Sequence, residues 1–212
     1  MRVGILGSGS VAQALGTGFL KHGHDVVLGT RDPAKLAEWV GEHDAAGVGS
    51  VAEAAAHGEL VVLAVRGAAA EQVMRSAGEH NLAGKPVIDT TNPIADAPAV
   101  NGVIQYFTGL DESLMERLQT AFPAAKLVKA FNSVGNALMV EPAVPGGPPT
   151  MFICGNDTGA KSTVRGILED FGWDVADFGA VEAARAIEPL CILWCIPGLV
   201  DGTWNHALRL LR

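Results

Sequence analysis

The segment GILGSGSVAQALG, residues 4–16, constrains the fold of this chain more than any other. It places a G-x-G-x-x-A motif directly between an apolar run and a helical pattern near the N-terminus. In a strand–turn–helix unit, Gly7 permits the tight turn, Gly9 lets the backbone approach a pyrophosphate, and Ala12 lets the helix pack on the sheet. Amides at the helix N-terminus favour the phosphates. The motif predicts a dinucleotide site that contains Gly7, Ser8, Gly9, Ser10 and Val11.

Short apolar runs alternate with helical patterns along the chain, which is typical of βαβ units around a parallel sheet. We expect strands at Arg2–Leu6, Asp25–Gly29, Gly47–Gly49, Leu60–Val65, Pro86–Asp89 and Lys126–Phe131. We expect helices at Ser10–His22, Pro33–Glu42, Ser50–His57, Ala68–Ala77 and Ser113–Phe122. The predicted fold class is α/β, a Rossmann-type doubly wound and mostly parallel sheet.

A loop at VEPAVPGGPPT follows, because its prolines and glycines cannot form a helix or a central strand. Beyond it we expect extra C-terminal strands and a helical tail: strands Met151–Cys154 and Trp173–Phe178, a helix Gly159–Phe171, and a tail from Val181 in which Pro189 and Pro197 start or kink segments. These residues are too few for a second core. The sequence therefore predicts one domain over residues 1–212, with a dinucleotide-binding core at 1–140 and a C-terminal extension at 150–212.

Composition limits the partners and the compartment. A net charge of −8 argues against nucleic acid or an anionic membrane surface as the main partner. Three cysteines without metal-binding spacing favour a reducing, cytoplasmic compartment, and we expect no signal peptide because MRVGILG is already a core strand. The apolar segment LCILWCIPGLV, bounded by Glu188 and Asp201, is expected to be too short to cross a bilayer and to form a buried or interface helix.

The end of the second strand, in VVLGTRDP, carries the signal for cofactor choice. Folds of this kind that bind NAD place a carboxylate there, on the adenosine ribose, and a carboxylate would repel the extra phosphate of NADP. Here the position holds Thr30, followed by Arg31 and, near the start of the next helix, Lys35. A hydroxyl and two cations suit a phosphate, so we predict NADP(H). The alternative is a surface arginine paired with Asp32 or Glu38.

Further candidates follow the other strands, because ligands bind at the carboxyl ends of such strands. We expect Ala64, Val65 and Arg66 after the fourth strand, Thr91 and Asn92 after the fifth, and Asn132 and Ser133 after the sixth to line the nicotinamide and its ribose. An ordinary turn role is the alternative for each.

No residue is predicted to be catalytic or to bind a metal. Five histidines lie at polar helix ends, and the role of His206 is left open. Cys191 and Cys195 share a helix face but lie among apolar residues, so core packing is favoured over redox or metal chemistry.

Together these segments resemble the NADPH-dependent, coenzyme F420-type oxidoreductases and their relatives, which include the cytosolic reductase domain of the STEAP metalloreductases. The resemblance rests on GILGSGSVAQALG, LGTRDP, DTTNP, VKAFNS and FICGNDTGAK, and covers nearly the whole chain. It implies a single Rossmann-type domain, usually dimeric, that binds NADP and passes hydride to a flavin-like ring.

By position, the resemblance assigns Ser8 to Val11 to the pyrophosphate, Thr30, Arg31 and Lys35 to the 2′-phosphate, and Asn132 and Ser133 to the nicotinamide. The chain departs from archaeal deazaflavin enzymes in having Asn132 instead of histidine and Arg66 instead of a proline. The acceptor therefore stays open between coenzyme F420, a flavin and another small molecule. The apolar tail is expected to form a homodimer contact.

Two other functions fit parts of the sequence. A reductase of the imine or hydroxyacid type resembles the Rossmann half, but such enzymes need a long helical domain where this chain has a short tail. A non-catalytic NADPH sensor is the alternative from another class. Turnover of NADPH with an acceptor separates an enzyme from a sensor.

Overall fold

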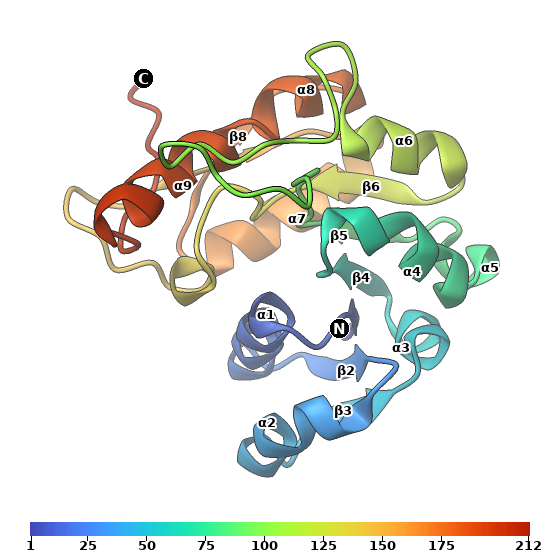
Figure 1. Cartoon of the computed structure of the whole chain (residues 1–212). Helices are drawn as coiled ribbons and strands as arrows, with labels where there is room; N and C mark the ends of the chain where they lie inside the picture. The colour runs from blue at the N-terminus through green and yellow to red at the C-terminus, as the bar shows by residue number, and fades with distance from the viewer.

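The computed structural model describes all 212 residues. It contains a six-stranded parallel sheet with the strand order β3-β2-β1-β4-β5-β6 (Figure 1). The strands are β1 (Arg2–Leu6), β2 (Asp25–Gly29), β3 (Gly47–Gly49), β4 (Leu60–Leu63), β5 (Pro86–Asp89) and β6 (Lys126–Lys129). This is the strand order of a Rossmann fold, whose two halves meet between β1 and β4. The predicted fold class is therefore confirmed.

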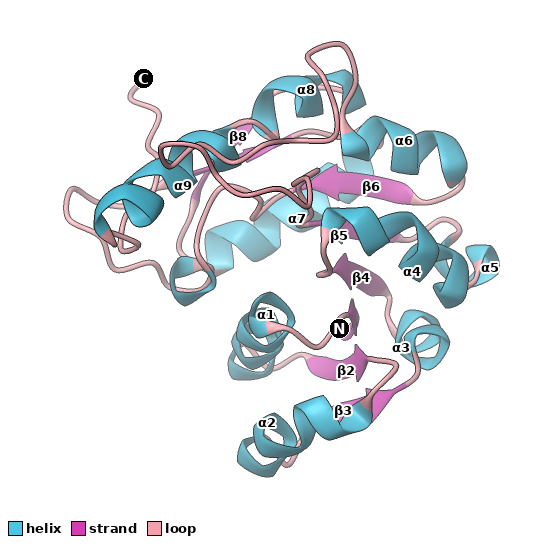
Figure 2. Ribbon diagram, viewed as in Figure 1, coloured by secondary structure: helices cyan, strands magenta, loops and turns pink.

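Helices cover both faces of the sheet (Figure 2). The helices before the C-terminal extension are α1 (Ser10–Lys21), α2 (Ala37–Glu42), α3 (Val51–His57), α4 (Ala70–Ala77), α5 (Glu79–Leu82) and α6 (Leu114–Ala121), with short 3-10 turns η1 (Pro33–Leu36), η2 (Gly67–Ala69) and η3 (Asn136–Leu138). Ser50 and Ser113 begin α3 and α6 with capping boxes, in which Glu53 and Glu116 bond back to the cap. These local signals explain why both helices start where the sequence predicts.

The C-terminal extension forms a second, two-stranded parallel sheet. Its elements are β7 (Thr150–Ile153), α7 (Thr158–Asp170), β8 (Asp174–Asp177), η4 (Val181–Ala183), α8 (Ala184–Ile187) and α9 (Leu190–Asp201). An antiparallel bridge between Lys129 and Cys154 joins this sheet to β6. The extra strands are present as expected, in a separate small sheet.

Two apolar clusters form the core, one on each face of the main sheet. One contains side chains of α1, α2 and α7 packed on strand residues such as Val3 and Ile5. The other contains side chains of α3, α4 and α6 packed on residues such as Val61 and Leu63. The first cluster also includes Met151 and residues of α7, so the extension shares the core of the dinucleotide-binding part.

The long connection between β5 and α6 folds back on itself, which the sequence analysis did not anticipate. Antiparallel bridges pair Ile94 with Tyr106 and Val100 with Val103. Its tip packs on α9, since a Cβ added at Gly102 would lie 2.5 Å from the side chain of Val200. Figure 1 shows this connection running beside α9.

The helical tail is longer than its most apolar segment. The turns and helices from Val181 to Asp201 make a run of 21 residues, and its most apolar 18-residue stretch has a mean hydropathy of 1.5, which by length and composition alone is enough to cross a membrane. The segment LCILWCIPGLV is by itself shorter than a membrane span, but it forms part of this longer apolar run. A third of that 18-residue stretch is buried within the protein, and Glu188 in it is buried. Pro189 caps the start of α9 and Pro197 lies inside it.

Candidate functional site

The glycine loop lies at the carboxyl end of β1, between the ends of β2 and β4. Gly7 has a φ of +144°, and a Cβ there would lie 2.2 Å from the carbonyl oxygen of Ala64, so only glycine fits this turn. A Cβ at Gly9 would meet nothing within 4 Å. The space beside Gly9 is therefore open to a ligand, as close approach of a pyrophosphate requires.

The first turn of α1 presents free amide groups to that space. No side chain caps the helix at Gly9, and no acidic residue lies in its first turn. The amide of Gln13 bonds to the Gly9 carbonyl, and its side chain holds the carbonyl of Ser8 at 3.1 Å. Ala12 is fully buried against the sheet, as its place in the motif predicts. Unpaired N–H groups and the helix dipole both favour an anion here.

The end of β2 carries two unpaired cations. Arg31, Lys35 and Arg66 are the three of the fifteen lysines and arginines whose side chains form neither a hydrogen bond nor an ion pair. All three are exposed. The alternative of a surface pair between Arg31 and Asp32 or Glu38 is therefore absent from the structure. The hydroxyl of Thr30 accepts a bond from the Asp32 amide at 3.1 Å, which shapes the turn.

The ends of β4 and β5 lie on the other side of the glycine loop. Ala64 is buried beneath Gly7, whereas Val65 is half-buried and Arg66 exposed. A Cβ at Gly67 would lie 2.0 Å from the carbonyl oxygen of Asn92. The segment after β4 therefore runs from the glycine loop to the turn after β5.

The turns after β5 and β6 are joined by two asparagines. The Asn92 amide donates to the Asn132 carbonyl at 2.7 Å, and the Asn132 amide donates to the Asn92 side-chain oxygen at 3.2 Å and to the Ile187 carbonyl at 3.0 Å. The side-chain oxygen of Asn132 is buried without a partner. Ser133 lies beside it and is buried. A buried acceptor without a donor is costly, and this oxygen is one of the few such atoms in the protein.

In the same turns, the Thr91 side chain is not placed as expected, and the backbone of Phe131 is strained. The Thr91 side chain is buried, and its hydroxyl donates to Asp89 at 2.7 Å. It lies below the surface, as do the largely buried side chains of Asn132 and Ser133. Phe131, before Asn132, has a φ of +62°, which is rare for an aromatic residue. Such strained conformations cluster at functional sites.

A buried charge cluster beneath these turns was not predicted from the sequence. Lys129, the last residue of β6, is fully buried, and its ammonium lies 2.7 Å from the Asp89 carboxylate and 2.9 Å from that of Glu188. It also donates to the Thr91 carbonyl at 2.8 Å. Burial alone would lower the pKa of Lys129, but the two carboxylates together raise it above its ordinary value. The cation is therefore permanent at physiological pH.

The Glu188 carboxylate also caps α6. Its two oxygens accept from the amides of Leu114 and Met115 at 2.9 and 3.0 Å. Because Glu188 follows α8, this one side chain ties the helical tail to α6 and β6. Charges of opposite sign at the last residues of neighbouring strands, Asp89 and Lys129, were the one sequence signal for the cluster. Nothing in the sequence pointed to Glu188.

Tyr106 completes the network above this cluster. Its hydroxyl lies 2.8 Å from the Glu188 carbonyl and 3.3 Å from the Asn92 side-chain oxygen. Burial, with a smaller effect of Cys191, raises the pKa of Tyr106. The Cys191 and Cys195 sulfurs lie 3.9 Å apart. His206 stacks on Trp194 and bonds to its carbonyl at 2.9 Å, which makes it a packing residue of the tail.

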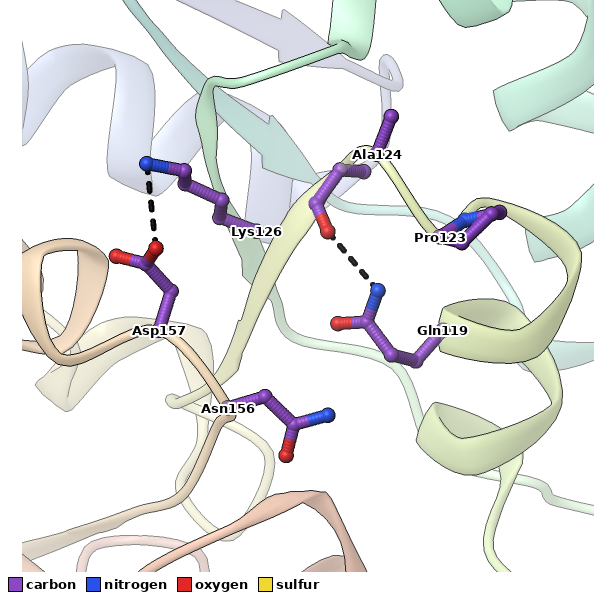
Figure 3. Close-up of a pocket in the computed structure, with 7 residues that line it drawn as sticks. Gln119, Pro123, Ala124, Lys126, Asn156 and Asp157 are labelled. Carbon is purple, nitrogen blue, oxygen red and sulfur yellow. Dashed lines mark hydrogen bonds and ion pairs between the residues drawn. The ribbon is translucent and has the colours of Figure 1, made fainter.

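A separate cavity of about 290 Å³ lies at the amino end of β6, between α6 and α7 (Figure 3). Its polar groups are already paired: Lys126 with Asp157 at 3.2 Å, and Gln119 with the carbonyl of Ala125 at 2.9 Å. Ligands of parallel sheets bind at the opposite ends of the strands. The charged and orphaned groups are also found there, so the candidate site is the carboxyl edge of the sheet.

Known proteins match this chain over most of its length. Residues 2–93 match the family described as NADP oxidoreductase, coenzyme F420-dependent. The rat metalloreductase STEAP3 is 32% identical over 203 residues, and the human metalloreductase STEAP2 is 27% identical over 210 residues. These matches cover 94% and 93% of this chain but only 39% and 38% of those relatives, so the chain spans about two-fifths of their length.

Solved structures agree with this assignment. The crystal structure of a candidate F420-dependent NADP reductase from Arthrobacter sp. FB24 has a TM-score of 0.93 and 35% identity, and the match covers 100% of this chain and 99% of that one. An imine reductase from Streptomyces aurantiacus, 17% identical with a TM-score of 0.69, shares the fold over 95% of this chain and 64% of its own. The chain therefore belongs to the family of coenzyme F420-dependent NADP oxidoreductases, and it is an NADP-dependent oxidoreductase.

Proposed function

We propose that this protein binds NADPH across the carboxyl edge of its sheet and transfers hydride between it and a flavin or deazaflavin ring. The observation that carries the proposal is that two exposed cations, Arg31 and Lys35, follow Thr30 after the end of β2 and form no ion pair within the protein. In this fold the adenosine ribose lies at that point, so an additional phosphate on it meets positive charge and no carboxylate.

The glycine loop would hold the pyrophosphate. The amides of Ser10 and Val11 open α1 without a capping side chain, and the backbone at Gly9 is open to a ligand. Gly7 and Ser8 shape the turn that leads into them. The loop thus supplies hydrogen-bond donors and a helix dipole without needing a charged side chain.

The nicotinamide would lie over the turns after β4, β5 and β6. Asn132 would support this floor from beneath, because its amide bonds to Asn92 and to the Ile187 carbonyl fix the turn. Ser133 and the exposed part of Asn92 would complete this floor, with the backbone of Ala64 and Val65 along one side. Thr91 would contribute through its backbone, because its side chain is buried.

A flavin-like acceptor is inferred from the family resemblance and from the absence of an acid or base side chain at this end of the site. The side chains nearest the nicotinamide position are amides and a hydroxyl, with no exposed carboxylate or histidine among the residues named. Hydride passage from nicotinamide C4 to a flavin-like ring requires alignment and exclusion of water, and solvent supplies the accompanying proton. An amide-lined floor that holds one ring flat is sufficient for that task.

The experiment is an absorbance assay of NADPH oxidation with F420, FMN, FAD or riboflavin as acceptor, and with a cyclic imine as a control for the alternative reductase class. Stoichiometric loss of NADPH and of the oxidised acceptor ring is expected with a flavin or with F420. Tight NADPH binding without turnover of any acceptor would favour a sensor. Turnover of the imine alone would move the protein to the other reductase class.

We further propose that the protein is a cytoplasmic homodimer joined through its helical tail. Leu193, Leu199, Val200 and Trp204 are exposed on or near α9, which leaves an apolar face that a second copy would cover. Glu188 ties the same run to Lys129 inside the protein, which favours a protein contact over a membrane anchor. Light scattering of the purified chain tests this: a monomer at micromolar concentration would contradict it.

A further inference from the structure

The third unpaired cation, Arg66, was expected from the sequence to line the nicotinamide and its ribose, but the cofactor contacts proposed above leave its charge without a partner. Ten of the other cations pair with carboxylates and two bond to backbone carbonyls, although acidic residues outnumber basic ones by 23 to 15. An exposed guanidinium that finds no partner in so acidic a chain lies where an external anion can reach it. Arg31 and Lys35 share that property and have an assigned role.

The position of Arg66 separates it from the 2′-phosphate site. Leu6 of β1 pairs with Gly29 of β2 on one side and with Leu63 of β4 on the other. Arg31 and Arg66 therefore follow strands on opposite sides of the glycine loop. Adjacent strands are about 4.8 Å apart, so the ends of β2 and β4, which Arg31 and Arg66 follow, are separated by about 10 Å.

Arg66 instead belongs to the nicotinamide half of the site. Its neighbour Val65 lies 3.4 Å from the position of a Cβ on Gly7, and its other neighbour, Gly67, packs on the Asn92 carbonyl. The backbone at Arg66 is extended, with φ −61° and ψ 140°. The backbone at Arg66 is thus held between the glycine loop and the floor on which the reacting rings would lie.

We propose that Arg66 is the anion subsite for the electron acceptor: it binds a phosphate or carboxylate carried on the acceptor's side chain and so selects phosphorylated flavin-like acceptors over neutral ones. The inference rests on the proposed function and deepens it. The pyrophosphate has the amides of α1, and the 2′-phosphate has Arg31 and Lys35, so the cofactor's charges are already matched. A planar guanidinium binds two phosphate oxygens at once, which makes Arg66 a specificity-determining residue.

Riboflavin and FMN test this, because they share one ring and differ by one phosphate. Flavin dissociation constants are measured by fluorescence quenching on the NADP⁺-loaded protein, independently of turnover. FMN is expected to bind on the order of tenfold more tightly than riboflavin at low salt, and the preference should shrink in high salt because the site is exposed. Arg66→Ala should abolish the preference by weakening FMN alone, and Arg66→Lys should keep part of it.

Arg75→Ala is the matched control, since it removes the same charge from an exposed arginine that is paired with Glu71 on α4. It should leave the FMN preference intact. Equal binding of FMN and riboflavin, binding of neither, or a preference that survives Arg66→Ala would overturn the inference. So would an equal loss of NADPH affinity in Arg66→Ala, which would assign Arg66 to the cofactor. A phosphate preference without turnover would leave the subsite standing and refute the hydride acceptor.

Discussion

Replacing Lys129 with methionine removes the cation from a charge cluster that has almost no access to water. The side chains of Lys129, Asp89 and Glu188 are 0%, 0% and 1% exposed. At an effective dielectric constant of about 20, an ion pair at this separation is worth roughly 6 kcal/mol before desolvation is counted. The ammonium regains hydration when the protein unfolds, so the net cost is smaller. Measured losses of one partner from a buried cluster are about 3–5 kcal/mol.

We therefore expect Lys129→Met to lower the free energy of unfolding by about 3–5 kcal/mol, which for a chain of this length is a fall in Tm of roughly 6–20 °C. Urea titration followed by circular dichroism measures it, with calorimetry as the second probe. Arg75→Met is the control: its pair with Glu71 is 2.6 Å long but more than half exposed. Its removal should cost no more than about 1 kcal/mol.

A second variant separates the charge argument from a simple loss of packing. Glu188→Gln should cost less in the Lys129→Met background than in the native protein, because it relieves the repulsion between two uncompensated carboxylates. The coupling expected between such neighbours is about 0.5–3 kcal/mol. The reasoning is refuted if Lys129→Met costs less than 1 kcal/mol, or if the two substitutions contribute additively.

Three further predictions test the site and its surroundings. Arg31→Ala should weaken NADPH binding about tenfold or more while leaving NADH nearly unchanged, because a charged hydrogen bond to the 2′-phosphate is worth about 1.5–3 kcal/mol; equal losses in calorimetric titrations would contradict the phosphate role. Tyr106 is the single tyrosine, and burial raises its pKa, so the folded form keeps its proton while the unfolded form loses it above about pH 10. Stability should fall as pH rises beyond that point, and tyrosinate absorbance should appear only with unfolding; a signal from the folded protein near pH 10 would refute this. Finally, a hydrogen bond with Cys191 lowers the pKa of Cys195, whereas burial raises that of Cys154 to about 12. Iodoacetamide should therefore label Cys195 first, as peptide mass spectrometry would show, and equal rates at all three thiols would exclude it.

The local parts of the fold were readable from the sequence because they depend on neighbouring residues. The turn at Gly7, the capping boxes at Ser50 and Ser113 and the alternation of strands and helices each need only a few consecutive residues. Strand ends were less accurate: β4 and β6 stop two residues before the expected limits, since pairing with neighbouring strands decides where a strand ends. The cofactor-loop candidates also follow from local rules, and their ligand contacts stay predictions.

Tertiary structure alone decided which polar groups form hydrogen bonds or ion pairs within the protein and which have no partner there. In the sequence Thr91, Asn92 and Asn132 look alike as turn residues, yet the fold buries the Thr91 hydroxyl on Asp89 and leaves the Asn132 oxygen without a donor. Likewise the sequence places Lys129 within an expected strand but does not indicate that Glu188, far along the chain, pairs with it. Short-range chemistry set the βαβ pattern and the cofactor class; long-range packing set the charge balance, because Coulomb and hydrogen-bond partners are chosen by distance in space and not by distance along the chain.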